Sequence, residues 1–322
     1  MNNIIITNIG RRGYLVDYIK EISIFHAKIF VSDCDYTASG LYGNNDGNFI
    51  LPRPVDDECL YVKKLTNLCL SHDIGIVIPV IDPEIYILSK YKMQMLQYGI
   101  NVIVSCKNVL DICYNKLCMN NFLKDNGFLV PKTYITIKEF FYDLKENKIN
   151  FPVIVKPIYG SGSVETEIIS NLEKLNLIFH DGLMIQELLK GIEYGCDVFN
   201  TFDKEPVRCV VKKKISMRSG ETDKSLTVEN KLLQRLGINI GKMLGHIGNL
   251  DFDVFETQKG EYIIDMNPRF GGGYPATHAA GCNLLELLLR MCNGEMIKPD
   301  FDSYTKNLLV MKEIKITTHL IE

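Results

Sequence analysis

The segment Ile74–Val80 most constrains the fold, because it is apolar and β-branched apart from one glycine and one proline. A strand of this kind suits a parallel sheet that is covered on both faces. Further strand-like runs lie at Ile4–Thr7, Lys28–Val31 and Ile100–Val104. Helical patterns alternate with them, at Tyr14–Ile22, at Tyr61–His72 and from Pro83 onward. This β-α-β order predicts a doubly wound parallel sheet over about residues 1–105.

From Lys107 the pattern changes to short strands separated by turns. We expect one helix over Val109–Asn126, ended by Gly127. Strands are then expected at Phe151–Pro157, Met184–Leu189, Tyr194–Thr201, Val207–Met217, Leu250–Phe255 and Tyr262–Met266, and helices at Gln234–Leu244 and Leu284–Met291. Residues 106–300 should therefore form a mixed α+β region, and residues 301–322 should add one or two short strands.

Composition narrows the function classes. The 322 residues carry 36 Lys and Arg against 39 Asp and Glu, so no global basic field attracts nucleic acid or an anionic membrane. No apolar stretch is long enough to span a bilayer, and basic residues follow the opening apolar run, the wrong order for a secretory signal. The ten cysteines form no CxxC pair, which indicates reduced thiols in a cytoplasmic protein.

A buried strand with a lysine near its end leads directly into a turn of small residues. The lysine is Lys156, and the turn holds Gly160, Ser161, Gly162 and Ser163. Small residues let backbone N–H groups approach phosphate oxygens, and the lysine adds positive charge. Walker A and GxGxxG patterns are both absent. A phosphate-binding loop is one interpretation, and a hairpin turn with a solvated lysine is the other.

Two later segments alternate acidic and apolar side chains. Residues 250–255, LDFDVF, show the pattern of a half-buried strand, and residues 262–269, YIIDMNPR, follow after a turn. We expect an antiparallel hairpin. Asp265 and Asn267 are two positions apart, so their side chains leave the same face of the strand.

Asp251 or Asp253 can lie opposite Asp265 and Asn267 in such a hairpin. Two carboxylates and an amide oxygen suit Mg²⁺, which also takes oxygens from nucleotide phosphates. Arg269 would then balance charge on a transferred phosphoryl group. The alternative is that the first two acids face solvent and Asp265 caps a turn. The apolar residues that precede Asp265 on its strand argue against that alternative.

Taken in order, these motifs resemble those of the ATP-grasp superfamily, in particular one half of the carbamoyl-phosphate synthase large subunit. The resemblance extends from the opening strand to about residue 295. Lys116 matches the first phosphate lysine, although Asn115 stands where the family usually has Asp. Lys156 matches the second phosphate lysine, and the loop Gly160–Ser163 would fold over the phosphates.

The resemblance also implies how the nucleoside is held. Glu187, Leu188 and Leu189 look like the hinge that recognises adenine, with Glu187 accepting from the exocyclic amine and the Leu189 backbone meeting the ring edge. Glu193, in the sequence GIEY, would bind the ribose hydroxyls.

Metal ligands and catalytic residues follow in the same way. Asp251, Asp265 and Asn267 match the family's metal ligands, and Asp253 is less favoured because the ligand directly follows the hydrophobic position held here by Leu250. Two further groups resemble catalytic elements: Arg269 matches the arginine that holds the acid and its acyl phosphate, and Lys214 and Arg218 lie on a basic strand that contacts the triphosphate or the acid. The sequence does not decide which of Lys212, Lys213 and Lys214 faces the phosphates.

The resemblance thus implies an N-terminal Rossmann-like domain (1–105), a two-lobed ATP-grasp domain (106–300) and a C-terminal extension packed on it (301–322). Its cofactors would be ATP and Mg²⁺, with Mn²⁺ as an alternative ion. Asp33, Asp82, Glu84 and the segment Gly271–Pro275 would border the acceptor site, although a purely structural role suits the first three equally well.

The expected function is an ATP-dependent ligase that activates a carboxylate as an acyl phosphate for attack by an amine. Two alternatives stay open: another phosphoryl transfer, as a small-molecule kinase or through carboxy-phosphate, and a non-catalytic nucleotide-binding module. The expected partners are small-molecule carboxylates and amines, with no nucleic acid and no membrane, and a homodimer is left open.

Overall fold

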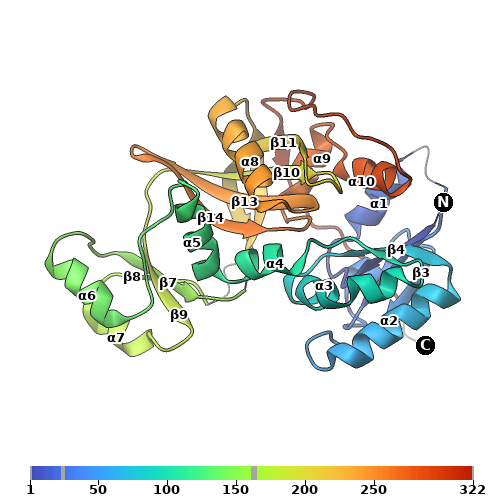
Figure 1. Cartoon of the computed structure of the whole chain (residues 1–322), viewed down its shortest axis with the longest axis horizontal. Helices are drawn as coiled ribbons and strands as arrows, with labels where there is room; N and C mark the ends of the chain where they lie inside the picture. The colour runs from blue at the N-terminus through green and yellow to red at the C-terminus, as the bar shows by residue number, and fades with distance from the viewer. Residues whose placement is uncertain (1, 23–25, 161–164, 321–322) are drawn as a thin grey trace.

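The computed structural model describes residues 2–22, 26–160 and 165–320, and the strands in these ranges form three sheets (Figure 1). The N-terminal sheet has the order β3-β2-β1-β4-β5, and all of its neighbouring strands are parallel. Its strands are β1 (Asn3–Thr7), β2 (Ile29–Asp33), β3 (Gly47–Ile50), β4 (Ile74–Pro79) and β5 (Asn101–Val102). The predicted doubly wound parallel sheet is confirmed.

Helices cover both faces of this sheet, as its apolar strands require. They are α1 (Tyr14–Lys20), α2 (Glu58–Ser71) and α3 (Asp82–Leu96), with a short 3₁₀ helix, η1 (Ser39–Tyr42). Ile5 and Val77 pack in the core with α2 and α3, whereas Ile4 and Ile6 pack on the opposite side with α1 and the later helix α10 (Leu284–Cys292). The strand order reverses between β1 and β4, so the loops after these two strands flank a crevice where ligands commonly bind.

The second sheet is antiparallel, with the order β14-β13-β10-β11-β12-β15. Its strands are β10 (Ile192–Asn200), β11 (Pro206–Arg218), β12 (Glu221–Thr227), β13 (Gly248–Thr257), β14 (Gly260–Asn267) and β15 (Leu309–Met311). One face packs on α4 (Lys107–Tyr114), α5 (Lys116–Asp125) and α8 (Lys231–Leu244). Alternate residues such as Phe252 and Val254 enter this core, which leaves the intervening side chains on the other face.

The third sheet is the smaller lobe at the end farthest from the N-terminal sheet (Figure 1). Its order is β6-β9-β7-β8, built from β6 (Thr133–Tyr134), β7 (Val153–Pro157), β8 (Glu167–Ile169) and β9 (Leu183–Glu187). Val153 and Val155 pack in a core with α6 (Ile137–Lys145) and α7 (Leu172–Ile178). Because side chains alternate along a strand, Ile154 and Lys156 leave β7 on the other side.

The prediction of one helix over Val109–Asn126 was wrong. The chain breaks into α4 and α5 at Asn115, whose backbone is extended and whose side chain accepts hydrogen bonds from the N–H groups of Leu117 and Cys118. Asparagine is a favoured N-cap residue because it satisfies the free N–H groups at a helix start. The break places Lys116 at the first position of α5.

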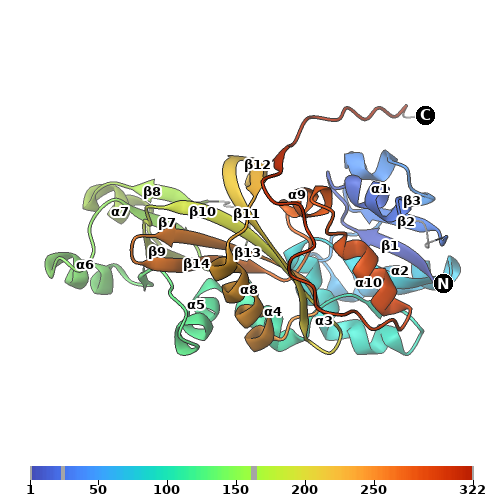
Figure 2. The same cartoon turned by 90° about the horizontal axis from the view of Figure 1, so that it is seen from above.

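The helices α9 (Tyr274–Ala279) and α10 follow the second sheet. In its described part, the tail from residue 301 adds one short strand, β15, as expected. Beyond β15 the chain passes toward the N-terminal sheet (Figure 2), where Lys315 Nζ lies 3.7 Å from Asp17 Oδ2 and the His319 ring stacks on Tyr42. None of the described helices is both long and apolar enough to cross a bilayer. The limits predicted for the domains, at residues 105/106 and 300/301, stay predictions.

Candidate active site

One cavity of about 810 Å³ lies where the three sheets meet. Its walls hold most of the predicted site residues. Lys116 comes from the start of α5, and Lys156 and Gly160 come from β7 and the segment after it. The antiparallel sheet and the residues that follow it supply Glu193, Lys214, Asp251, Asp253, Asp265, Asn267 and Arg269. The N-terminal sheet adds Arg12 and Asp82 through the loops after β1 and β4. The cavity therefore joins residues that are far apart in sequence.

Two lysines form the cationic wall of the cavity. Lys156 lies on β7, and burial lowers its pKa to about 8, against the opposing effect of the Asp265 carboxylate. Lys116 is held by its backbone N–H, which donates to Ile158 O at 2.9 Å, and its Nζ donates to Gly160 O. Both lysines can therefore neutralise phosphate charge from the same side. Ser161, Gly162 and Ser163 of the predicted loop lie outside the described residues.

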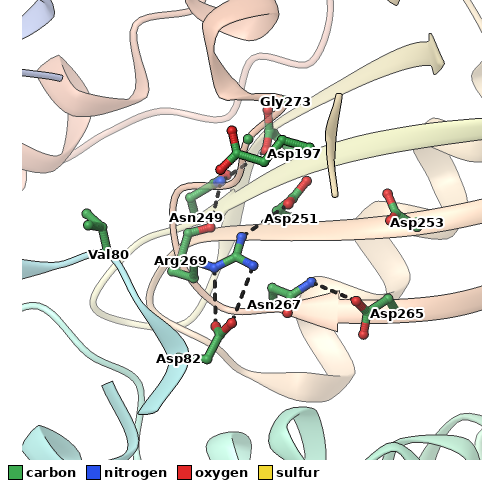
Figure 3. Close-up of polar contacts among 12 residues, drawn as sticks. Val80, Asp82, Asp197, Asn249, Asp251, Asp253, Asp265, Asn267, Arg269 and Gly273 are labelled. Carbon is green, nitrogen blue, oxygen red and sulfur yellow. Dashed lines mark hydrogen bonds and ion pairs between the residues drawn. The ribbon is translucent and has the colours of Figure 1, made fainter. Parts of the chain in front are cut away.

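The opposite wall is the β13–β14 hairpin. Its antiparallel register pairs Asp251 with Asn267 and Asp253 with Asp265. Asn267 Nδ2 donates to Asp265 Oδ2 at 3.2 Å (Figure 3). The sequence predicted this shared face, and the structure places all four oxygen-bearing side chains in the wall of one cavity.

Lys214 is the member of the basic strand that faces the cavity. Its Nζ lies 2.6 Å from Asp253 Oδ1 and 2.8 Å from Glu193 Oε1. Although burial acts to lower it, these two carboxylates raise the pKa of Lys214. Lys212 instead makes a buried contact with Asp197 and donates to Thr277 at 2.9 Å, a structural role. The structure thus places Lys214 at the cavity and Lys212 in the core, and contact of Lys214 with the phosphates stays a prediction.

Burial raises the pKa of Asp253 to about 7, with a further contribution from Asp251 and against the lowering effect of Lys214. Burial and the Asp197 charge also raise the pKa of Asp251. Carboxylates that lie close together in a partly buried wall gain stability from a cation. Lys214 and Arg269 supply part of this charge to Asp253 and Asp251, and a metal ion beside Asp265 would supply more.

Arg269 joins the antiparallel sheet to the N-terminal sheet. Its Nε lies 3.2 Å from Asp82 Oδ1, and its Nη1 lies 3.3 Å from Asp251 Oδ2 (Figure 3). Although burial acts to lower it, the Asp82 and Asp251 carboxylates raise the pKa of Arg269. The guanidinium thus lies fixed and charged at the boundary between the two sheets.

The glycines after Arg269 make room for acidic side chains. A Cβ atom on Gly271 would lie 1.9 Å from Asp251 Oδ2, and one on Gly272 would lie 2.8 Å from Cβ and Cγ of Glu221. Neither spacing is tolerable for nonbonded atoms, so this segment needs residues without a side chain. The glycines bring the backbone against the acidic wall of the cavity.

The ATP-grasp domain model matches residues 113–273, half of the chain. The chain belongs to the ATP-grasp family. The predicted membership is therefore confirmed, and a second model, the PylC-like N-terminal domain, matches residues 4–103.

Individual ATP-grasp relatives are distant. The chain is 24% identical over 267 residues to a carbamoyl-phosphate synthase of Methanobrevibacter smithii, covering 78% of this chain and 70% of that protein. It is 28% identical over 170 residues to the α-aminoadipate–LysW ligase LysX of Sulfurisphaera tokodaii, covering 48% and 58%. The solved biotin carboxylase of Campylobacter jejuni shares the fold, with a TM-score of 0.74 at 18% identity over 96% of this chain and 74% of that one.

The remaining predicted ATP-grasp positions lie at the edge of the cavity or outside it. Glu187 ends β9, and Leu188 and Leu189 follow in the connection to β10, so this segment does link the two ATP-grasp lobes. Glu187 Oε2 accepts from Lys132 N at 3.3 Å. Arg218 is not part of the cavity lining, and its guanidinium lies 3.3 Å from Asp223.

Of the three acids expected beside the acceptor, only Asp82 lines the cavity. Asp33 accepts a hydrogen bond from Gly10 N at 2.7 Å, which holds the loop after β1. Glu84 is fully buried and contacts the Tyr61 hydroxyl, and burial raises its pKa to about 7. For these two residues the structure shows the structural role that the sequence left open.

The Mg²⁺ that the family implies requires oxygen ligands. Within the described ranges, no three acidic, histidine or cysteine side chains already surround one point. Asp265 and Asn267 do offer a carboxylate and an amide oxygen on one face, with Asp251 and Asp253 opposite. Mg²⁺ needs only one or two protein carboxylates, because waters and phosphates complete its octahedron. The residues therefore fit this ion.

Three residues at the cavity were given no individual role from the sequence. Arg12 and Glu221 line the cavity, and Lys312 contacts Gly272 at its edge. Arg12 follows the first strand in the sequence NIGRRG, the crevice position of a doubly wound sheet, which is a signal that could have identified it. Glu221 ends the segment 218–221, RSGE, which resembles part of the basic strand of the family. Lys312 carries no such signal, because only the folded sheet brings it to the cavity.

Proposed function

We propose that this chain is an ATP-dependent ligase that joins a carboxylate to an amine and yields an amide, ADP and phosphate. The observation that supports it most is the pairing of Lys116 and Lys156 on one wall of the cavity with Asp265, Asn267 and Arg269 on the other. These are the parts that phosphoryl transfer to a carboxylate needs: cations for the phosphates, oxygen ligands for a metal, and an arginine for the acid.

A carboxylate resists an amine because its carbon is a poor electrophile. In the proposed reaction a carboxylate oxygen forms a bond to the γ-phosphorus of ATP while the bond to the ADP oxygen breaks. The amine nitrogen then bonds to the acyl carbon, phosphate leaves, and the nitrogen loses a proton. The protein contributes mainly position and charge to both steps.

Each wall has a separate task in this proposal. Lys116 and Lys156 bind the phosphates, and Arg269 binds the acid and its acyl phosphate. Asp265 and Asn267, with Asp251 or Asp253, would hold Mg²⁺, which supplies neutralising charge to the phosphates when it is bound.

The proposal also assigns residues to the adenine, the ribose and the phosphates of ATP. Glu187–Leu189 would bind adenine, Glu193 would bind the ribose, and Gly160–Ser163 would cover the phosphates. Lys214 would reach the γ-phosphate from its position between Glu193 and Asp253. A catalytic role for Arg218 stays a prediction. Its side chain is 55% exposed, pairs with Asp223 and does not line the cavity.

The test is a screen for ADP release with Mg-ATP and pairs of small-molecule acids and amines. We expect ADP release that needs both an acid and an amine, with the amide detected by mass spectrometry. Lys156→Met is the matched negative control, since it removes the phosphate cation but keeps an unbranched side chain. ADP release with a hydroxyl compound and no amide product would contradict the ligase and favour a kinase. Light scattering of the same sample tests for a homodimer.

A further inference from the structure

A small apolar recess opens off the cavity next to Asp82. It has a volume of about 20 Å³, beside the 810 Å³ of the cavity itself. Asp82, Tyr114 and Asn267 line both the recess and the cavity, so the recess is a side chamber of the candidate active site. Its walls come from α3, α4 and the end of β14, and they consist largely of Ile85, Tyr86, Leu110, Cys113, Tyr114 and Met266.

The apolar character of the recess follows from the spacing of residues along α4. Cys113 and Tyr114 come three and four positions after Leu110, so the three side chains share one face of this helix. Ile85 and Met266 add to the walls from α3 and β14, and both are buried. Burial raises the pKa of the Cys113 thiol. The thiol therefore stays protonated at neutral pH and acts as a small apolar group.

A stack of tyrosine rings fixes one wall of the recess. The rings of Tyr86 and Tyr114 stack with their centroids 5.4 Å apart, and the ring of Tyr159 lies 5.9 Å from that of Tyr114. The Tyr86 hydroxyl donates to Asp111 Oδ1 at 3.0 Å, and Lys107 Nζ lies 5.3 Å from the centre of the Tyr86 ring. Because these contacts hold the rings in place, the recess is already formed before a ligand binds.

Water is a poor occupant of such a recess. A buried water molecule normally makes about three hydrogen bonds, whereas these walls are mainly carbon and sulfur. The polar groups at the mouth of the recess have partners outside it, since Asp82 pairs with Arg269, and Asn267 Nδ2 donates to Asp265 at 3.2 Å (Figure 3). An apolar group that displaces poorly held water gains free energy. The chemistry of the walls therefore favours a hydrocarbon substituent.

The neighbours of the recess indicate which substrate would fill it. Asp82 Oδ1 lies 3.2 Å from Nε of Arg269, the residue proposed to bind the acid. Asn267 is a proposed ligand of the metal that neutralises the phosphates. An acid held by Arg269 beside the γ-phosphate would thus have its carbon chain near the mouth of the recess. The segment proposed to bind adenine, Glu187–Leu189, lines neither the recess nor the cavity.

We propose that this recess is the side-chain subsite for the acid, and that the activated acid carries a short apolar group close to its carboxylate. The inference rests on the proposed ligase function and deepens it by naming the substrate class. A recess of this volume has room for about one or two carbon atoms. Leu110 and Cys113 would limit the size of the group, and a bulky or charged substituent would be excluded.

The test uses straight-chain monocarboxylates from formate to hexanoate. Thermal stabilisation in the presence of Mg-ADP measures their binding. Hydroxamate formation with Mg-ATP and hydroxylamine measures their activation, because the hydroxylamine nitrogen bonds to the acyl carbon as phosphate leaves. We expect apparent affinity to rise about fourfold for each methylene that enters the recess and to fall for chains that are too long to fit. A wild-type series without such a maximum would overturn the subsite, even if hydroxamate forms.

Variants of Cys113 decide whether the recess is responsible. Cys113→Leu should fill it and move the maximum to a shorter acid, and Cys113→Ala should move the maximum to an acid about one carbon longer. Cys292→Leu is the matched control and should keep the wild-type maximum, because this half-buried thiol on α10 lines neither the recess nor the cavity. If Cys113→Leu does not fold, Cys113→Ala decides alone.

The two readouts separate this inference from the ligase function. A maximum that stays unchanged in the Cys113 variants would overturn the subsite and leave the ligase standing. Chain-length-dependent binding that the Cys113 variants shift, without hydroxamate from any acid, would instead contradict the ligase function and leave the recess as an apolar subsite for carboxylates.

Discussion

Arg269 at the end of the β13–β14 hairpin pairs with Asp82 at the start of α3, with 3.2 Å between Nε and Oδ1. The two side chains are only 10% and 13% exposed. The same guanidinium reaches Asp251 Oδ2 at 3.3 Å. The arginine proposed to bind the acid is therefore positioned by one carboxylate from the N-terminal sheet and one from the antiparallel sheet. Movement of either sheet would change its position.

Asp82→Asn should loosen this contact while keeping the size of the side chain. A mostly buried guanidinium would lose one of its two carboxylates, so we expect unfolding free energy to fall by about 1–3 kcal/mol. The KM for the acid should rise more than the KM for ATP. Urea denaturation and steady-state kinetics measure the two effects. Asp111→Asn breaks the surface pair with Lys107 and should cost little; equal losses in the two variants would contradict the prediction.

The regular parts of this protein were predictable because they rest on local patterns. The apolar β4 and the alternating β13 and β14 follow directly from side-chain periodicity, and so does the shared face of Asp265 and Asn267. The break at Asn115 was missed because the apolar pattern continues through it, although asparagine's capping tendency was visible. The Arg12 and Glu221 contact links positions 209 apart. Such contacts depend on how the sheets pack, which no local pattern encodes.

Lys156 should make the stability of the apo protein change with pH in the alkaline range. Burial lowers its pKa to about 8, so the folded protein releases this proton at a lower pH than the unfolded chain. Between roughly pH 8 and 10 the unfolded chain binds more protons, and stability should rise with pH. Below that window the lysine is charged in both states, and its burial lowers stability.

Lys156→Met should therefore raise apo stability at pH 7 and abolish the increase between roughly pH 8 and 10. It should also weaken Mg-ATP binding, because the phosphates lose a cation. Urea midpoints at both ends of the window and calorimetry with Mg-ATP measure these effects. Lys124→Met, on the exposed C-terminal turn of α5, is the control. An unchanged alkaline increase in Lys156→Met would show that another group is responsible.

Asp253 should make the apo protein less stable as pH rises through the acid range, which is the opposite of the effect expected for Lys156 in the alkaline range. Its pKa is raised to about 7 by burial and by Asp251, so the folded protein binds this proton where the unfolded chain has lost it. Apo stability should accordingly fall as pH rises from roughly 4 to 7. Asp253→Asn should remove that fall and raise the apo melting temperature at pH 7. If its melting temperature follows the wild-type pH profile, Asp253 is ionised throughout by its pairing with Lys214.

Asp265→Asn should separate catalysis from folding at the proposed metal site. The substitution keeps size and an acceptor for Asn267 Nδ2, which lies 3.2 Å from Asp265 Oδ2, so it removes mainly charge. Without one carboxylate, Mg²⁺ should bind more weakly and phosphate charge in the transition state should be less well neutralised. We expect ADP production to fall about a hundredfold or more, as for loss of one preorganised electrostatic group.

The apo melting temperature of Asp265→Asn should stay constant or rise, because repulsion within the acidic wall is relieved, while stabilisation by Mg-ATP should shrink. Asp251→Asn and Asp253→Asn in the same assay identify the third ligand by the larger loss of Mg²⁺ dependence. The position of Asp251 directly after Leu250 predicts it as this ligand, although its contact with Arg269 means that this variant also disturbs the proposed acid site. Mg²⁺ titration at saturating acid isolates the metal effect. An apo protein that unfolds, or turnover with unchanged Mg²⁺ dependence, would rule out Asp265 as a metal ligand.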